Sequence, residues 1–164
     1  MDAPTGADAC LRKVSDRAPF EIKLGDGRRS VSRHARAFPA RLDEFPGVVA
    51  FVAEVSSQAG FDREDVLRLT LILEELFTNT VTHGRGDGTP VTLELDVAHG
   101  RISVMYEDSG PRFEPFVDAA TSEGQENRPP GGLGLLLVNR LGRDVQYSHS
   151  GGRNRFSLVV EITR

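Results

Sequence analysis

Apolar residues recur along the chain at spacings that change from helical to strand-like. Between Leu42 and Ala59 they stand three or four positions apart, which predicts a helix that Gly60 ends. A second helix is predicted to begin after Asp62, a residue type that caps helices, and to run to His83. Its Leu, Ile, Phe and Val residues occupy most of the helix circumference, so we expect this helix to be largely buried.

Alternating apolar and polar positions predict the strands. Residues 34–39 are typical of a short edge strand, and a further short helix is predicted over residues 135–141. Four more runs have a strand pattern: 91–97, 101–106, 144–149 and 154–162. Helices and strands that come in runs, without regular βαβ alternation, predict an α+β fold. We expect a two-layer sandwich in which a mostly antiparallel mixed sheet carries helices on one face.

Composition narrows the class of protein. The 164 residues, 38% of them hydrophobic, suit one domain, which we expect over residues 34–164 after a flexible polar N-terminal arm, residues 1–33. The net charge of −4 includes no basic block, which argues against direct binding of nucleic acid. Cys10 is the single cysteine, so a disulfide within the chain is excluded. The sequence has neither a secretory signal pattern nor an apolar run of about 20 residues, and therefore predicts a cytoplasmic protein without a membrane span.

A carboxylate and a carboxamide stand four residues apart in the second predicted helix. Glu75 and Asn79 therefore project from one face, one turn apart, with Thr82 on the same stripe and His83 at its edge. An unpaired polar group inside a core costs roughly 2–7 kcal/mol. These side chains therefore line a cleft, form a solvated strip at the helix edge, or pair with each other internally.

Two glycine-containing segments are further candidates. Asp108-Ser109-Gly110 is either an ordinary turn or a site where Asp108 accepts a hydrogen bond from an exocyclic amine while Gly110 lets a ring approach the backbone. Gly131-Gly132-Leu133-Gly134, before the third predicted helix, is either a hinge or an anion site made of backbone N–H groups. It fits neither a Walker P-loop nor a Rossmann fingerprint.

Together and in this order, these segments resemble the GHKL (Bergerat-fold) ATPase family, and within it the small serine-kinase anti-sigma factors of bacteria. LILEELFTNTVTHG resembles the N-box of that family, and YEDSGPRFEP resembles its adenine-contacting box. GGLGLLLVNRL resembles its glycine box, and GGRNRFSLVV its last hairpin. The resemblance covers roughly residues 34–164.

The resemblance implies a site for ATP and magnesium. Asn79 would coordinate Mg²⁺ beside triphosphate oxygens, and Glu75 would be the general base. Asp108 would bind the adenine amino group, with Gly110 beside the ring, and residues 115–131 would form a lid. Further nucleotide contacts are implied for His83, Phe113, Arg128, Gly131, Gly132, Leu133 and Gly134.

The resemblance also implies a function. The chain would be an ATP-dependent serine/threonine protein kinase and anti-sigma factor. It would phosphorylate a STAS-domain anti-anti-sigma protein and sequester a sigma factor or related regulator, and homodimers are common in the resembled family. Three alternatives stay open: a non-catalytic nucleotide-binding module that switches between partners, a histidine-kinase-like ATPase domain, and a structural α+β domain that binds no nucleotide.

Overall fold

A computed structural model describes residues 32–84, 88–98, 100–112 and 132–162. The lid expected over residues 115–131 lies outside the described residues, as does the N-terminal arm apart from its last two positions, so both stay predictions. The elements in chain order are β1 (Ser32–Phe38), a short 3-10 helix η1 (Leu42–Glu44), α2 (Phe45–Ala59), α3 (Arg63–His83), β2 (Val91–Ala98), β3 (Arg101–Asp108), α4 (Gly132–Leu141), β4 (Arg143–Ser150) and β5 (Arg153–Glu161).

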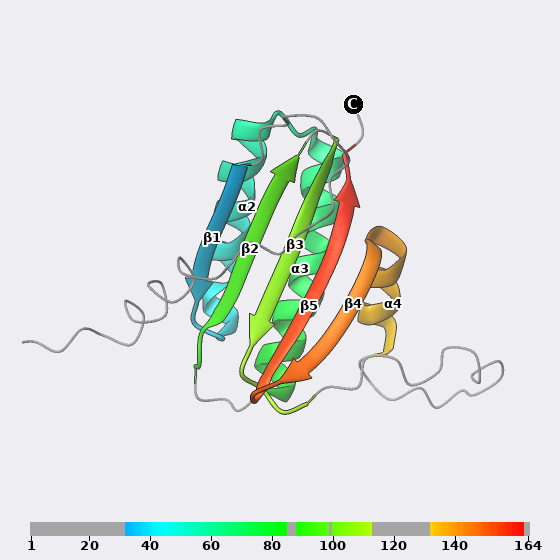
Figure 1. The fold of residues 1–164 in the computed structure, drawn as a ribbon. Helices are drawn as coiled ribbons and strands as arrows, with labels where there is room; N and C mark the ends of the chain where they lie inside the picture. Colours follow the sequence, from blue (N-terminus) through cyan, green and yellow to red (C-terminus); the bar gives the residue numbers. More distant parts are fainter. Residues whose placement is uncertain (1–31, 85–87, 99, 113–131, 163–164) are drawn as a thin grey trace, which may run out of the picture.

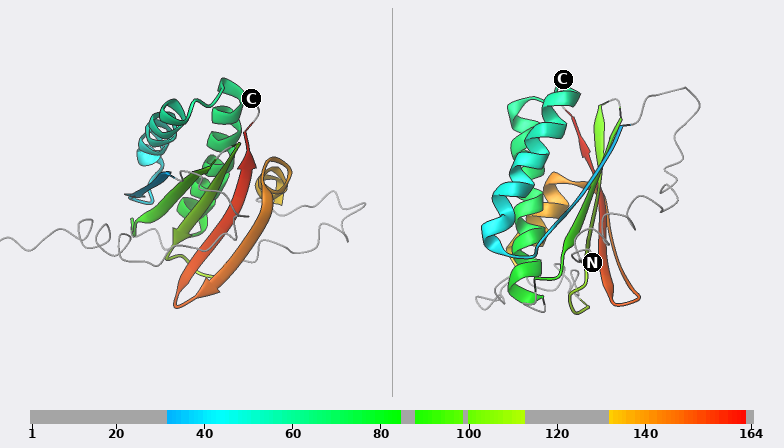
Figure 2. Two further views of the ribbon diagram at one scale, coloured as in Figure 1. Left: turned by 45° about the horizontal axis from the view of Figure 1, so that its top comes forward. Right: turned by 90° about the vertical axis from the view of Figure 1, so that its left-hand side faces the viewer.

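The five strands form one open sheet in the order β1-β2-β3-β5-β4. Every neighbouring pair is antiparallel, so the described sheet contains no parallel pair, where a mostly antiparallel mixed sheet was expected. The three α-helices pack on the same face of this sheet, as the edge-on view in Figure 2 and the face view in Figure 1 show. The predicted α+β fold, with its two layers, is therefore confirmed.

The hydrophobic core fills the space between the sheet and the helices. Alternation along β3 turns Ile102, Val104 and Tyr106 toward the helices, and all three are buried. The middle of α3 crosses this face and contributes a run of buried apolar side chains: Leu69, Ile72, Leu73, Leu76 and Phe77. Burial of α3 is less complete than its sequence indicated, because Leu67 near its start is 57% exposed. No helix in the described part of the chain is long and apolar enough to span a membrane.

The boundary between α2 and α3 follows from three residues. Gly60 ends α2 with φ 72°, a left-handed conformation that glycine adopts without steric cost. Asp62 is the N-cap of α3, and its Oδ1 accepts a hydrogen bond from the N–H of Asp65 at 2.8 Å. Both roles agree with the sequence. Together they fix where α3 begins, and therefore which of its residues face the sheet.

We expect Asp62→Ala to lower the free energy of unfolding by about 1 kcal/mol, because an N–H at the start of α3 loses its acceptor. Asp62→Asn keeps a capping oxygen and should stay close to the wild type. Urea unfolding followed by far-UV circular dichroism measures both changes. Equal losses in the two variants would contradict the capping role.

Candidate functional site

A pocket opens where the C-terminal half of α3 meets the ends of β3 and β5. Its lining residues are Leu76, Asn79, Thr80, His83, Gly84, Asp108, Gly110, Pro111, Arg112, Asn154 and Phe156. The fold thus brings together Asn79, His83, Asp108 and Gly110, which the sequence had singled out in two segments far apart along the chain. His83 is exposed at the end of α3, whereas Asp108 is only 6% exposed.

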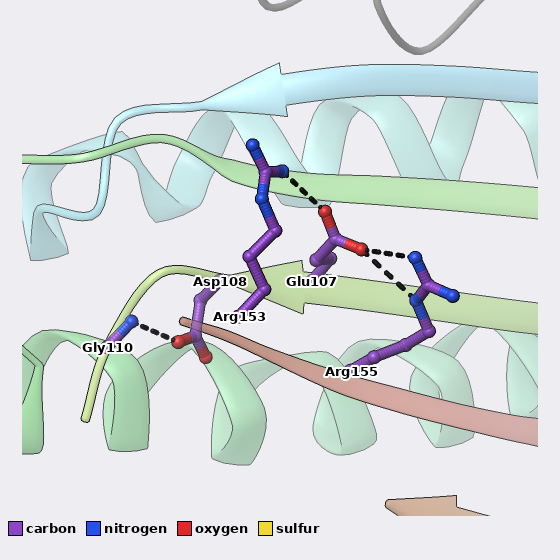
Figure 3. Close-up of polar contacts among 5 residues, drawn as sticks. All are labelled: Glu107, Asp108, Gly110, Arg153 and Arg155. Carbon is purple, nitrogen blue, oxygen red and sulfur yellow. Dashed lines mark hydrogen bonds and ion pairs between the residues drawn. The ribbon is translucent and has the colours of Figure 1, made fainter. Parts of the chain in front are cut away.

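The Asp108 carboxylate has a donor from each element around it. Thr80 of α3 donates its hydroxyl to Oδ2 at 2.9 Å. The backbone N–H of Gly110 donates to Oδ1 at 2.7 Å, as Figure 3 shows, and the Nδ2 amide of Asn154 donates to the same oxygen at 2.8 Å. A buried carboxylate is costly unless it is hydrogen-bonded, so these three donors hold Asp108 in place.

The turn after β3 approaches Asp108 so closely that it requires glycine. A Cβ at Gly110 would lie 2.9 Å from Oδ1 of Asp108 and 3.4 Å from Nδ2 of Asn154. Any side chain at this position would therefore displace the carboxylate or the turn. The glycine leaves the backbone itself as the wall of the pocket.

Tyr106 supports the site from inside the core. It is 2% exposed, and its hydroxyl donates to Thr80 Oγ1 at 2.8 Å while Thr80 donates to Asp108. Burial raises the pKa of Tyr106 well above its ordinary value, and the nearby Asp108 carboxylate raises it further. Tyr106 therefore stays protonated, and the direction of the hydrogen bonds runs from Tyr106 through Thr80 to Asp108.

Glu107 fixes the same strand end from the opposite face of the sheet. Figure 3 shows its carboxylate between two arginines of β5, on the other side of β3 from Asp108. Arg153 donates to Oε1 at 2.6 Å, and Arg155 donates twice to Oε2, at 2.7 and 3.1 Å. Glu107 is 5% exposed, so these charge-assisted bonds clamp β3 to β5 next to the pocket.

Asn79 and Glu75 lie on one side of α3 but contact different parts of the structure. Asn79 is half-buried and lines the pocket, and its buried Nδ2 has no hydrogen-bond partner among the described residues. Glu75, also half-buried, lies outside that pocket and against Gly134 of α4, where a Cβ would overlap its carboxylate and lie 2.9 Å from its Cδ. The unpaired amide excludes an internal hydrogen-bonded pair of Glu75 and Asn79.

The remaining predicted site residues are only partly described. Phe113, Arg128 and Gly131 lie outside the described residues, and their roles stay predictions. Gly132 and Leu133 begin α4, which therefore starts three residues earlier than the apolar pattern indicated. Glycines are tolerated there because the first N–H groups of a helix have no partner within it. Those free N–H groups are what an anion site at this helix end requires.

Among the described residues whose side chains support Asp108, Thr80, Tyr106 and Asn154 were missed from the sequence. For two of them the strand pattern held a usable signal. Tyr106 and Asp108 are two residues apart on β3 and so share a face. Asn154 is the polar first member of an otherwise apolar inward series in β5, which continues with Phe156 and Leu158. Thr80 had no such signal, because its role depends on which strand end lies opposite α3.

Comparison with known proteins gives a family match and several similar chains. Residues 38–160 match the model of a family described as the histidine kinase-like ATPase domain. The chain is 28% identical over 122 residues to the serine-protein kinase RsbW of Bacillus cereus (strain G9842) and 27% identical over 122 residues to that of Bacillus anthracis. Each alignment covers 70% of this chain and 76% of the relative.

A solved structure has a similar fold. It is the crystal structure of the RsbU and RsbW domains of a Mycobacterium tuberculosis protein, with a TM-score of 0.61 and 17% sequence identity. The match covers 81% of this chain and 33% of that chain. At this identity the likeness supports the fold alone.

The raised pKa of Tyr106 makes stability depend on alkaline pH. Above about pH 10 the unfolded chain loses this proton while the native protein keeps it, so the free energy of unfolding should decrease as pH rises. The contribution approaches about 1.4 kcal/mol per pH unit. Tyr106→Phe has no such proton, so its free energy of unfolding should decrease less steeply with rising pH. At neutral pH the variant should be less stable than the wild type, because a hydrogen bond is lost.

Urea unfolding at several values between pH 8 and 11 measures these slopes. Tyr147→Phe is the matched control, since it keeps Tyr106 and should retain the steep decrease. A Tyr106→Phe slope identical to that of the wild type would contradict the assignment.

Proposed function

Because the chain belongs to the histidine kinase-like ATPase domain family, we propose that its pocket binds ATP with magnesium and that the domain transfers the γ-phosphoryl group to a protein hydroxyl. The family match covers residues 38–160, and it confirms the resemblance to GHKL proteins drawn from the motifs. The observation that carries the proposal is the unpaired Asn79 amide, which lines a pocket together with the buried Asp108 carboxylate.

Asp108 supplies the base-recognising end. Its Oδ1 already accepts two hydrogen bonds, from Gly110 and Asn154, whereas Oδ2 accepts one, from Thr80. A carboxylate oxygen has two lone pairs, so Oδ2 can accept one more donor. The amino group of adenine is such a donor, whereas guanine presents a carbonyl oxygen at that position and would be repelled. The bare backbone at Gly110 leaves room for the purine ring.

Asn79 fits the magnesium end. Its carboxamide oxygen is a hard ligand of the kind Mg²⁺ prefers. The described residues contain no cluster of three or more His, Cys, Asp or Glu side chains that could hold a metal ion. Magnesium would therefore depend on triphosphate oxygens and water beside Asn79, which suits an ion that keeps several water ligands. The unpaired Nδ2 of Asn79 would find an acceptor among the same oxygens.

Glu75 is the candidate general base. Bound magnesium would supply charge neutralisation on the triphosphate, which leaves the protein to position the acceptor and to take its proton. Glu75 lies one helical turn before Asn79, and its carboxylate would accept the proton of the attacking hydroxyl. Gly134 allows α4 to come close enough to hold that carboxylate at the α3–α4 contact.

For the partners, we propose a serine or threonine of a STAS-domain anti-anti-sigma protein as the phosphoryl acceptor. The domain would also sequester a sigma factor or related regulator in the cytoplasm and release it on partner exchange. Support comes from the relatives named serine-protein kinase RsbW and from the motifs that resemble bacterial anti-sigma kinases. A non-catalytic partner-switching module is the main alternative, and the first experiment below separates the two.

Glu75→Gln should slow phosphoryl transfer from ATP to the STAS partner by about 10²-fold or more, because the amide cannot accept the hydroxyl proton. Nucleotide affinity should change little, since Glu75 lies outside the pocket. The measurement is transfer of labelled phosphate, with ATP affinity from calorimetry. Glu74→Gln is the matched control, because Glu74 is the exposed neighbour on the same helix and should behave as the wild type.

Undiminished transfer by Glu75→Gln would remove Glu75 from the reaction. A wild-type domain that binds ATP and a sigma factor but phosphorylates no STAS protein would support the non-catalytic module. Absence of ATP binding at millimolar concentration would contradict the whole proposal.

Asn79→Ala should weaken binding of ATP with magnesium by about tenfold or more, equivalent to about 1.4 kcal/mol, and binding of ATP in chelator by less. The difference arises because the variant loses the oxygen that faces the metal. Calorimetry in magnesium and in EDTA measures both affinities, with the exposed Thr78→Ala as control. Equal losses in the two conditions would contradict the metal role.

A further inference from the structure

Asn154 occupies an unusual position in β5. It pairs in register with Asp108 on β3, and the alternation of β5 turns its side chain toward the helices. It is 3% exposed, and the inward positions that follow it along the strand, beginning with Phe156, are apolar. A carboxamide buried at this depth is costly unless its donors and its acceptor are all satisfied.

All the hydrogen-bonding capacity of the Asn154 side chain is used. Its Nδ2 donates to Asp108 Oδ1 and to the carbonyl of Pro111, both at 2.8 Å. Its Oδ1 accepts the hydroxyl of Tyr147 at 2.8 Å and lies 2.9 Å from Nδ1 of His149. A carboxamide has two N–H donors and two acceptor lone pairs, so nothing is left over.

These four contacts allow one orientation of the amide. If it were flipped, Oδ1 would face the Asp108 carboxylate and the Pro111 carbonyl, which have no proton to share. The donors of Tyr147 and His149 on the other side favour the observed orientation. Tyr147 is itself held by its ring, whose centroid lies 5.0 Å from that of Phe156.

We propose that Asn154 is a positioning residue: held by Tyr147 and His149 of β4, it aims the Asp108 carboxylate at the amino group of adenine and so sets the base specificity of the site. The proposal rests on ATP binding in this pocket. Asn154 acts by fixing Oδ1 of Asp108, which leaves Oδ2 to accept the base. Its second bond, to Pro111, fixes the turn whose Gly110 faces the ring.

The geometry also determines the tautomer of His149. Oδ1 of Asn154 can only accept, so Nδ1 of His149 carries the proton. Neutral His149 is therefore the Nδ1–H form, and this consequence can be tested without any nucleotide. A test of this tautomer therefore examines the contacts among Asn154, Tyr147 and His149 independently of the proposed ATP binding.

The first test is base discrimination. Asn154→Ala should lower the ratio of the GTP to the ATP dissociation constant by roughly tenfold or more, because Asp108 is no longer aimed at the amine. If Asn154 only stabilised the fold, the variant would lose affinity for ATP and GTP equally, and the ratio of dissociation constants would stay unchanged. Asn139→Ala, at an exposed asparagine of α4, is the matched control and should keep the wild-type ratio.

The second test is whether Asn154 acts through Asp108. Asp108→Asn should itself lower the ratio, and the double variant with Asn154→Ala should lower it no further than Asp108→Asn alone. Additive losses would overturn the positioning role. If the wild type prefers ATP to GTP and Asn154→Ala keeps the same preference, the inference is wrong and the proposed function stands. If the wild type does not bind ATP, the proposed function itself is wrong.

The third test combines a conservative substitution at Tyr147 with an NMR measurement of the His149 tautomer. Tyr147→Phe removes one oxygen atom and should lower the discrimination ratio in the same direction by a smaller factor, even if Asn154→Ala does not fold. Nitrogen-15 spectra of the imidazole groups, with the His149 signal assigned through His149→Gln, should show the Nδ1–H tautomer. A neutral Nε2–H form of His149 in the native protein would overturn the network.

Discussion

Burial of the Asp108 carboxylate constrains the whole of this site. A charged group at 6% exposure needs donors, and it receives them from Thr80 on α3, Gly110 in the turn and Asn154 on β5. These elements belong to both layers of the fold, so a shift of any one would remove a hydrogen-bond donor from the carboxylate. The Glu107 ion pairs on the outer face hold β3 and β5 in the register that this arrangement requires.

Helix α3 has to satisfy two opposing demands. Its middle supplies buried apolar residues such as Leu76 and Phe77 to the core, while Glu75 and Asn79 on another side carry polar groups. The helix reconciles them by geometry, because residues four apart share a face that the core does not use. Among the described residues, the Nδ2 of Asn79 is nevertheless buried without a hydrogen-bond partner. A buried donor without an acceptor lowers the stability of the fold. Such a local conflict is expected at a residue with the metal-binding role proposed for Asn79.

Local features of the fold could be predicted from the sequence, and long-range features could not. The caps at Gly60 and Asp62 and the alternation of Ile102, Val104 and Tyr106 depend on near neighbours, so the element boundaries were correct within a few residues. The start of α4 was placed too late because its first residues are glycines, which have no apolar pattern. The pairing of Asp108 with Asn154 depends on β3 and β5 becoming neighbours across a helix and a strand, which no local pattern encodes.

The two ends of the site differ in how firmly the fold holds them. Around Asp108 the side chains come from paired strands, every polar atom of Asn154 is engaged, and Tyr106 extends the network into the core. Glu75 instead lies against α4, at a point where a Cβ on Gly134 would overlap its carboxylate. Rigid hydrogen-bonded groups suit recognition of a base that does not change during a reaction. Under the proposed function the elements that would set affinity, around Asp108, are therefore separate from the α3–α4 contact that would set the rate.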